Sequence, residues 1–161
     1  MVLWEGNLVK AHLVADENNK PLHNGHIEVC LLDEEKDMII TAATDGYIKW
    51  WSREQIDAAE ADEHPEVPID CKREVLIKTE SGEPAHIINI VRGNGLWLLS
   101  DVKGRLWRIN PENMEARVIL EYHSGSITDM VVSDAYNMAL SCAEDGTVKV
   151  WDYTRAEAYY S

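Results

Sequence analysis

The chain has 161 residues, the length of about one domain, and its 29 acidic and 15 basic side chains give a formal charge of −14. Because such a charge repels phosphate backbones and anionic lipid surfaces, neither nucleic-acid binding nor membrane insertion is expected. The cysteines Cys30, Cys71 and Cys142 are far apart, and the sequence has no signal-peptide pattern and no long apolar run. Together these features predict an intracellular protein without a disulfide framework, a zinc site or a membrane span.

A hairpin pattern occurs twice in the sequence, at residues 38–51 and again 100 residues later at 138–151. Each copy reads as a short apolar strand, an Asp-Gly turn and an alternating strand that ends in Trp. A weaker copy at residues 96–109 has Lys103 in place of the turn aspartate, and residues 4–10 read as the end of an earlier unit. The turn glycines of the four units are then Gly6, Gly46, Gly104 and Gly146. This spacing indicates a repeat architecture.

An acidic insertion at residues 53–70 lengthens the interval between the second and third turn glycines. Ser52 and Gln55 have the spacing of a capping box, which predicts a short helix from Arg53 to about Ala61. The rest of the insertion predicts an extended solvated loop.

The acidic side chains of the insertion form a candidate interaction loop for a basic partner, since surface loops carry recognition while strands hold the shape. A loop that only keeps the protein soluble is the alternative, with equal weight. The candidate loop contains Asp57, Glu60, Asp62, Glu63, Glu66 and Asp70.

Four short strands per unit, repeated with turn signals, predict an all-β fold of propeller blades rather than a sandwich. We expect the end of a preceding blade at residues 1–14, a blade with the insertion at 23–81, a degenerate blade at 82–122, and a last blade at 123–161 with its fourth strand cut short. No parallel pairing is expected, because helical crossovers are absent. About three blades do not close a ring, which needs about four to eight.

These repeats resemble the WD-repeat family across nearly the whole chain, and the spacing carries the resemblance more than the Trp-Asp dipeptide. The dipeptide occurs as Trp151-Asp152, whereas its counterpart is Trp51-Ser52. WD blades are held by a buried relay of His, Ser or Thr, Asp and Trp. The resemblance implies this structural role for two sets at identical separations, which are His23, Thr41, Asp45 and Trp51, and His123, Ser141, Asp145 and Trp151.

Such a relay has a simple chemical basis. An imidazole can donate a hydrogen bond to the turn carboxylate while it accepts one from the hydroxyl, which in turn accepts from the indole N–H. Loss of one member would leave the others unpaired, at about 1–3 kcal/mol. In the middle unit the same positions hold Glu83, Leu99, Lys103 and Ile109, so this unit is expected to rely on packing.

Several short segments look like one branch of the family, the large WD-repeat proteins of the ciliary and flagellar axoneme. They are residues 3–10, 23–25, 44–48, 56–57 and 122–125. The resemblance implies a non-catalytic scaffold on the axonemal cytoskeleton that is needed for ciliary movement. Its partners would be axonemal tether subunits, an inner-arm dynein and, indirectly, doublet microtubules. A general WD-repeat adaptor in a cytosolic complex, for ubiquitin ligation or trafficking, is the alternative.

Catalysis is the competing interpretation of one relay, because Ser141, His123 and Asp145 have the composition of a hydrolase triad. Ser141 lies in mid-strand, however, without the G-x-S-x-G elbow that exposes a nucleophile, and the same spacing recurs around Thr41. No enzyme is therefore predicted.

Metal binding is also not predicted. His23 and His26 form an H-x-x-H pair, but His23 belongs to the relay, and the acidic insertion lacks the pattern of a calcium loop. No cofactor motif occurs. Cys30 and Cys142 lie on apolar strands and are expected to be buried.

Overall fold

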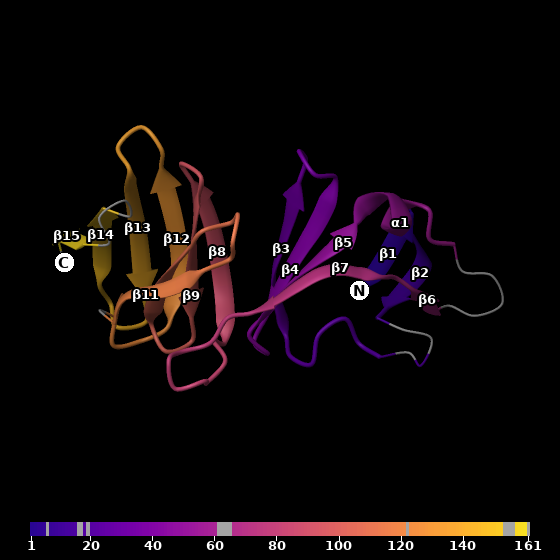
Figure 1. The fold of residues 1–161 in the computed structure, drawn as a ribbon, viewed down its shortest axis with the longest axis horizontal. Coiled ribbons are helices and arrows are strands. Elements are labelled where there is room, and N and C mark those ends of the chain that lie inside the picture. The colour runs from indigo at the N-terminus through magenta and orange to yellow at the C-terminus, as the bar shows by residue number, and fades with distance from the viewer. Residues whose placement is uncertain are drawn as a thin grey trace.

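The computed structural model describes residues 1–5, 7–15, 18, 20–60, 66–121, 123–152 and 157–160. Its strands form four small sheets that follow one another along the chain (Figure 1). The first sheet contains β3 (Ile27–Asp33), β4 (Met38–Ala43), β5 (Tyr47–Ser52) and β7 (Cys71–Leu76). The middle sheet contains β8 (Ile87–Gly93), β9 (Leu96–Asp101), β10 (Arg105–Ile109) and β11 (Ala116–Glu121). The last sheet contains β12 (Ile127–Ser133), β13 (Met138–Ala143), β14 (Val148–Asp152) and β15 (Glu157–Tyr160).

The expected hairpins are present in these three sheets. β4 pairs with β5, β9 with β10 and β13 with β14, all antiparallel. The turn glycines Gly46, Gly104 and Gly146 have φ angles of 84°, 75° and 77°, in the region that favours glycine. The all-β prediction is confirmed.

The N-terminal sheet contains β1 (Val2–Glu5), β2 (Leu8–Val14) and β6 (Glu66–Pro68). The pairing of β1 with β2 has a register shift between Leu3 and Trp4. This shift skips one residue of the later strand, as it does between the third and fourth strands of every other sheet. The first and second strands of those sheets are also shifted, but there the skipped residue is on the earlier strand, and the second and third strands pair without a shift. β1 and β2 therefore correspond to third and fourth strands. In the sequence Gly6 lies between β1 and β2, so this register does not support its grouping with the glycines that join second and third strands. Gly6 itself lies outside the described residues.

The acidic insertion contributes β6, and this strand corrects two predictions. β6 pairs in parallel with β2, placing Glu66 opposite His12 and Pro68 opposite Val14. The sequence predicts a solvated loop here and no parallel pairing, and both predictions are wrong for residues 66–68. Three residues that include a proline give too little periodicity to predict a strand. The insertion, which follows β5 of the first sheet, thus adds one strand to the N-terminal sheet beside β2.

Helix α1 (Arg53–Asp57) begins where the capping motif predicts it. The Ser52 hydroxyl accepts a hydrogen bond from the Gln55 backbone N–H at 3.3 Å. The helix ends at Asp57, because Ala58 is its C-cap. It is shorter than the expected helix, whose end at Ala61 lies outside the described residues.

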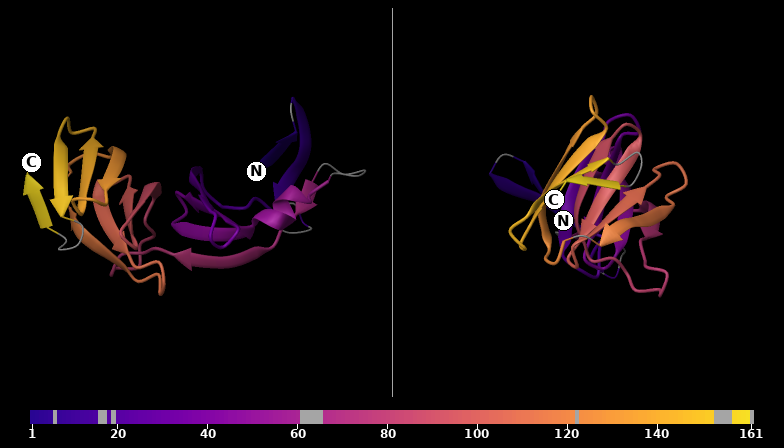
Figure 2. Two further views of the ribbon diagram at one scale, coloured as in Figure 1. Left: turned by 90° about the horizontal axis from the view of Figure 1, so that it is seen from above. Right: turned by 90° about the vertical axis from the view of Figure 1, so that its left-hand side faces the viewer.

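Neighbouring sheets pack face to face, and the alternation of side chains along each strand decides which core a residue joins. Trp50 lies between the first and middle sheets, where it stacks on Trp97 with 6.1 Å between ring centroids. Trp51 points the other way and packs with the N-terminal sheet and the insertion. Leu98 and Leu99 divide in the same manner between the two faces of the middle sheet. Figure 2 shows the resulting open arc, with the termini at its two ends.

The last sheet has a fourth strand where the sequence predicts one that is cut short. β15 pairs with β14 and covers 4 residues, against 6 in β7 and β11. The face of this sheet that points away from the middle sheet carries apolar side chains with exposed fractions of 54% for Val131, 38% for Leu140 and 57% for Val148.

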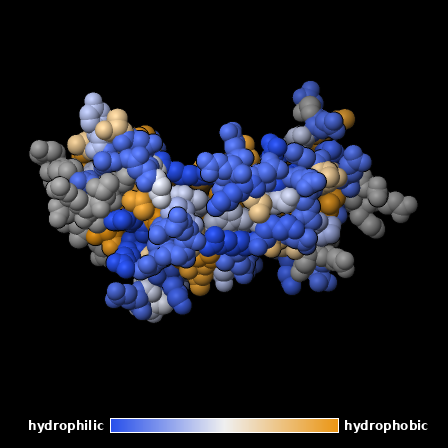
Figure 3. Space-filling view, turned by 45° about the horizontal axis from the view of Figure 1, so that its top comes forward, coloured by the Kyte–Doolittle hydropathy of each residue, from blue (hydrophilic) through white to orange (hydrophobic). Residues whose placement is uncertain are grey.

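Hydrophilic residues cover most of the surface in Figure 3, with hydrophobic ones gathered in separate patches. None of the described helices is long and apolar enough to cross a membrane. The prediction that Cys30 is buried is wrong, since it is exposed on β3 together with Glu28 and Leu32. These three residues alternate along the first strand of its sheet and share its uncovered side.

Candidate functional site

The first sheet brings together the four residues of the first predicted relay. Nδ1 of His23 lies 3.2 Å from both carboxylate oxygens of Asp45, in the turn after β4. Nε2 of His23 lies 2.8 Å from the Thr41 hydroxyl, and the Trp51 indole nitrogen lies 2.8 Å from the same hydroxyl. The chain of contacts runs from the loop before β3, through β4, to the end of β5.

With a neutral imidazole, only one arrangement of hydrogens satisfies this chain. The indole N–H of Trp51 can only donate, so the Thr41 oxygen accepts from it and donates its own hydrogen to Nε2 of His23. The imidazole proton is then on Nδ1 and is donated to Asp45. Burial lowers the pKa of His23 and outweighs the hydrogen bond and charge of Asp45, which act to raise it. The imidazole is therefore neutral at pH 7.

The last sheet repeats this geometry. Nδ1 of His123 lies 3.1 Å from Asp145 and Nε2 lies 2.8 Å from the Ser141 hydroxyl, to which Trp151 donates at 2.7 Å. Thr147 adds a hydroxyl that donates to Asp145 at 2.7 Å. This hydrogen bond, with those from the Thr147 and Ser124 backbone and from His123, holds the pKa of the Asp145 carboxyl far below its usual range.

The relay geometry offers no accessible nucleophile. Ser141 is only 1% exposed, and Thr41 is fully buried. Each hydroxyl oxygen already contacts an indole and an imidazole, so a substrate carbonyl has no path to it. His26 is exposed, and no group of three or more potential metal ligands occurs in the part of the chain that the structure describes.

In the middle sheet the relay positions are occupied differently. Leu99 and Ile109 are fully buried and take the places of the hydroxyl and the indole. Glu83 takes the place of the neutral histidine and Lys103 that of the aspartate, and the two form an exposed ion pair at 3.0 Å. The middle sheet therefore has apolar packing at two of the relay positions, as the sequence predicts, and an ion pair at the other two.

Sequence reasoning missed a buried polar network in the middle sheet. The Asp101 carboxylate accepts hydrogen bonds from the Arg105 side chain at 2.6 Å and from the Trp107 indole at 3.0 Å. It also accepts from the backbone N–H groups of Lys103 and Arg105. A signal was available, because Arg105 and Trp107 are two residues apart on a strand and share a face, just after a turn that begins at Asp101.

Where the structure describes it, at residues 53–60 and 66–70, the insertion is a packed strap rather than a free loop. Its apolar residues Ile56, Ala59 and Ile69 are buried against Trp51 and the N-terminal sheet. The Gln55 side chain accepts from the Asp70 backbone N–H at 3.1 Å and donates to the Asp70 carboxylate at 3.4 Å.

The acidic residues of the candidate interaction loop lie on the outside of this strap. Asp57, Glu60 and Asp70 are exposed, and Glu66 is half-buried. Lys10 of the N-terminal sheet contacts the strap twice, donating to the Asp57 carbonyl at 3.4 Å and lying 3.9 Å from the Glu60 carboxylate. The other two predicted members, Asp62 and Glu63, lie outside the described residues.

Comparisons with known proteins agree with this architecture. A family model described as WD domain, G-beta repeat, matches residues 115–152. The match begins just before β11 and ends with β14, so it spans the fourth strand of the middle sheet and the first three strands of the last. The WD40 repeats of RRP9 superpose with a TM-score of 0.63 over 84% of this chain and 38% of that chain, at 14% identity, which is a likeness of fold.

Two similar proteins carry the same name. Over 96% of its length, the chain is 28% identical to cilia- and flagella-associated protein 44 of Mus musculus. Over 99% of its length, it is 25% identical to the protein of that name from Trypanosoma brucei brucei. It spans only 8% and 11% of the length of these two proteins. Residues 115–152 therefore match a WD repeat, the sheets have the fold of WD40 propeller structures without closing a ring, and nearly the whole chain is distantly similar to cilia- and flagella-associated protein 44.

Proposed function

We propose that this chain is a non-catalytic interaction scaffold of the ciliary or flagellar axoneme, within a complex that tethers inner-arm dynein to doublet microtubules. The observation that carries the proposal is the similarity to cilia- and flagella-associated protein 44, which extends over nearly the whole chain in both a mammal and a trypanosome. The protein would act in ciliary movement by holding neighbouring subunits in place.

The relays support the non-catalytic part of this proposal. Their serine, threonine and histidine side chains are buried and joined to one another, so they are suited to holding a loop against a hairpin. We infer that both relays are structural and that the boundaries of the blades follow the first, middle and last sheets.

The charge of the chain bears on how the scaffold would reach the microtubule. A formal charge of −14 disfavours direct contact with the acidic outer surface of tubulin. Attachment would therefore run through other axonemal subunits. Co-sedimentation of the chain with bare microtubules that persists at high salt would contradict this indirect attachment.

Localisation is the first test of the proposal. The endogenous protein is tagged in ciliated cells and imaged against an axonemal marker after detergent extraction. We expect the tagged protein to stay on the demembranated axoneme. A diffuse cytosolic signal that is lost on extraction would overturn the axonemal assignment and favour a cytosolic WD-repeat adaptor, for ubiquitin ligation or trafficking.

A second test concerns the strap as a docking surface for a basic partner. The double variant Glu60→Gln, Glu66→Gln neutralises two of its carboxylates. Glu80→Gln, Glu112→Gln is the matched control, since both glutamates of the control are exposed in turns outside the strap. We expect only the strap variant to lose a co-purified axonemal neighbour. Equal recovery of that neighbour with both variants would mean that the strap carboxylates serve solubility alone.

A further inference from the structure

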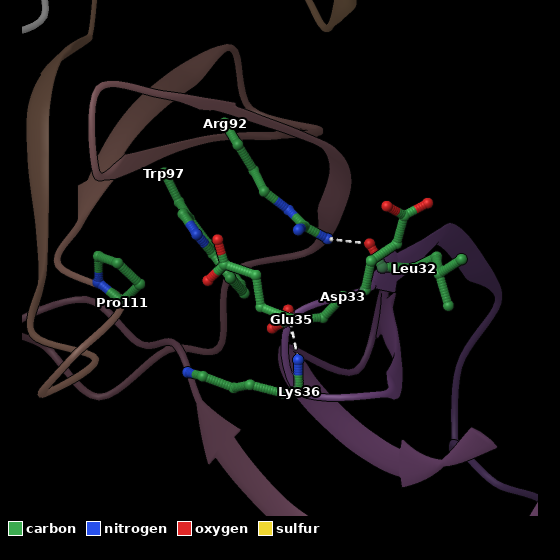
Figure 4. Close-up of a pocket in the computed structure, with 8 residues that line it drawn as sticks. Leu32, Asp33, Glu35, Lys36, Arg92, Trp97 and Pro111 are labelled. Carbon is green, nitrogen blue, oxygen red and sulfur yellow. Dashed lines mark hydrogen bonds between the residues drawn. The ribbon is translucent and has the colours of Figure 1, made fainter. Parts of the chain in front are cut away.

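A cleft of about 440 Å³ lies between the first and middle sheets, on the side of the β3–β4 turn. The turn contributes Asp33, Glu34 and Glu35, while the opposite wall is formed by Arg92 of β8, Trp97 of β9 and Pro111. Figure 4 shows the Glu35 side chain extending from the turn toward Trp97 across this space. The volume is within the range of about 300–1,000 Å³ that is usual for ligand sites.

The aromatic wall of the cleft is rigid and already receives a cation on one side. The Arg92 guanidinium lies 5.3 Å from the Trp97 ring centroid and donates to the Leu32 carbonyl at 3.2 Å, so it joins the two sheets. On its inner side Trp97 stacks on Trp50, and the Arg73 guanidinium lies 5.1 Å from the Trp50 ring centroid. The ring is therefore held between neighbours.

The carboxylates of the turn differ in how far they are already engaged. Asp33 accepts from the Lys36 backbone N–H at 3.3 Å, and Asp37 is paired with Arg53 at 2.6 Å. The Glu34 and Glu35 side chains make no hydrogen bond or ion pair within the part of the chain that the structure describes, and both are exposed. Lys36 is the cation of the same turn with which an incoming positive charge would have to compete.

We propose that this cleft binds an arginine or lysine side chain presented by an extended segment of a partner protein. The positive end group would lie between the carboxylates of Glu34 and Glu35. The aliphatic stem would pack on Pro111 and on the small part of Trp97, 7% of its surface, that is open to the cleft. Long basic side chains suit such a site because they combine an apolar stem with a charged head. The partner chemistry deepens the proposed scaffold function and rests on it only for the identity of the partner as a protein.

The test uses the isotopically labelled 161-residue chain and the peptide acetyl-Gly-Arg-Gly-amide, followed by NMR chemical shifts. We expect saturable shifts at the Trp97 indole N–H and at the Glu35 amide. The norleucine peptide acetyl-Gly-Nle-Gly-amide, which keeps the stem but lacks the charge, should bind more weakly. Binding that is equal for the two peptides would overturn the proposal, because it would assign the cleft to apolar contact alone.

Two variants that change the charge of the cleft in opposite directions extend the test. We expect Glu35→Gln to weaken arginine-peptide binding by about two- to fivefold, since one partly exposed ion pair is lost, and Lys36→Met to strengthen it. Glu144→Gln, in the exposed turn between β13 and β14, is the control with the same change of net charge and should leave the affinity unchanged. Equal weakening by Glu35→Gln and Glu144→Gln would show a general charge effect and overturn the site. Since the assay does not depend on location in the cell, its failure would leave the axonemal proposal standing.

Discussion

The middle sheet and the two sheets beside it hold the same corner of their hairpins with different chemistry. In the first sheet Trp51 donates to the Thr41 hydroxyl, within a chain of neutral groups that ends at Asp45. In the middle sheet Trp107 donates to the Asp101 carboxylate, which also holds a buried arginine. The indole has moved two residues along the third strand, since Ile109 occupies the position of Trp51. The comparison indicates that each hairpin needs a buried acceptor for its indole N–H, more than a fixed residue at a fixed position.

The two solutions differ in what happens when one member is lost. A neutral relay that loses its hydroxyl leaves two hydrogen-bonding groups without a partner. The Asp101 network that loses its carboxylate leaves a buried guanidinium without a counter-charge, which is a larger penalty. The middle sheet lacks a relay, but it should therefore be the more sensitive of the two.

The largest effect is expected for Asp101→Ala in the middle sheet. This change leaves Arg105 and the Trp107 indole without their acceptor and should lower the free energy of unfolding by about 3–5 kcal/mol, as measured by urea denaturation. Glu83→Ala is its control, because it removes only the exposed ion pair with Lys103 and should leave the free energy of unfolding nearly unchanged. Similar losses for the two variants would contradict the distinction between buried and exposed pairs.

The next effect compares equivalent positions of the middle and last sheets. Leu98 is buried between these sheets, whereas Leu140, at the same position of the last sheet, is 38% exposed. We expect Leu98→Ala to lower the free energy of unfolding by about 2–5 kcal/mol, and Leu140→Ala by less than about half of that. Equal losses in urea denaturation at low protein concentration would mean that the outer face of the last sheet is also covered.

A smaller effect is expected for the hydroxyl of the first relay. Thr41→Val keeps the shape but leaves Nε2 of His23 and the Trp51 indole without a partner, at about 1–3 kcal/mol. Leu99→Thr is the reciprocal change in the middle sheet, and it buries a hydroxyl where no relay histidine exists. We expect both variants to be less stable than the parent chain in thermal unfolding. A stable Leu99→Thr variant would show that the middle sheet can accept a relay hydroxyl without its partners.

The fold could be predicted from the sequence because the hairpins repeat in register and end in tryptophan. The relay residues could be located for the same reason, since His23 and His123 are set at the same distance from their turns. What could not be predicted belongs to single occurrences. The Asp101 network occurs in one unit alone among those described, so the repeats indicate only that Leu99 and Lys103 depart from the pattern.

The strap shows a second reason for the limit of prediction. Its composition is acidic, and composition alone predicts a solvated loop. Burial of Ile56, Ala59 and Ile69 depends on the N-terminal sheet, which lies far away in sequence and offers β2 as an edge for β6. A strand of three residues is decided by that edge and not by its own propensity.

The smallest effect is the pH dependence that the first relay gives and the middle sheet does not. Burial lowers the pKa of His23 below its ordinary value of 6.5, so the folded chain keeps this imidazole neutral at a pH at which the unfolded chain protonates it. The unfolded state then binds more protons, and the free energy of unfolding should fall as the pH drops below about 6.5, by at most about 1.4 kcal/mol per pH unit for this group. The loss stops once the pH is below the lowered pKa of the folded state, and above about pH 7.5 the group contributes no slope.

In the middle sheet Glu83 replaces the histidine, and its pKa is lowered by the hydrogen bond from Lys103, so it stays ionised throughout this window. We therefore expect His23→Gln to flatten the dependence of the urea midpoint on pH between about 7 and 5, while His26→Gln, which removes an exposed histidine of the same loop, serves as the matched control. An unchanged slope in His23→Gln would mean that the imidazole takes up its second proton over the same pH range in the folded and the unfolded chain, and it would contradict a pKa lowered by burial.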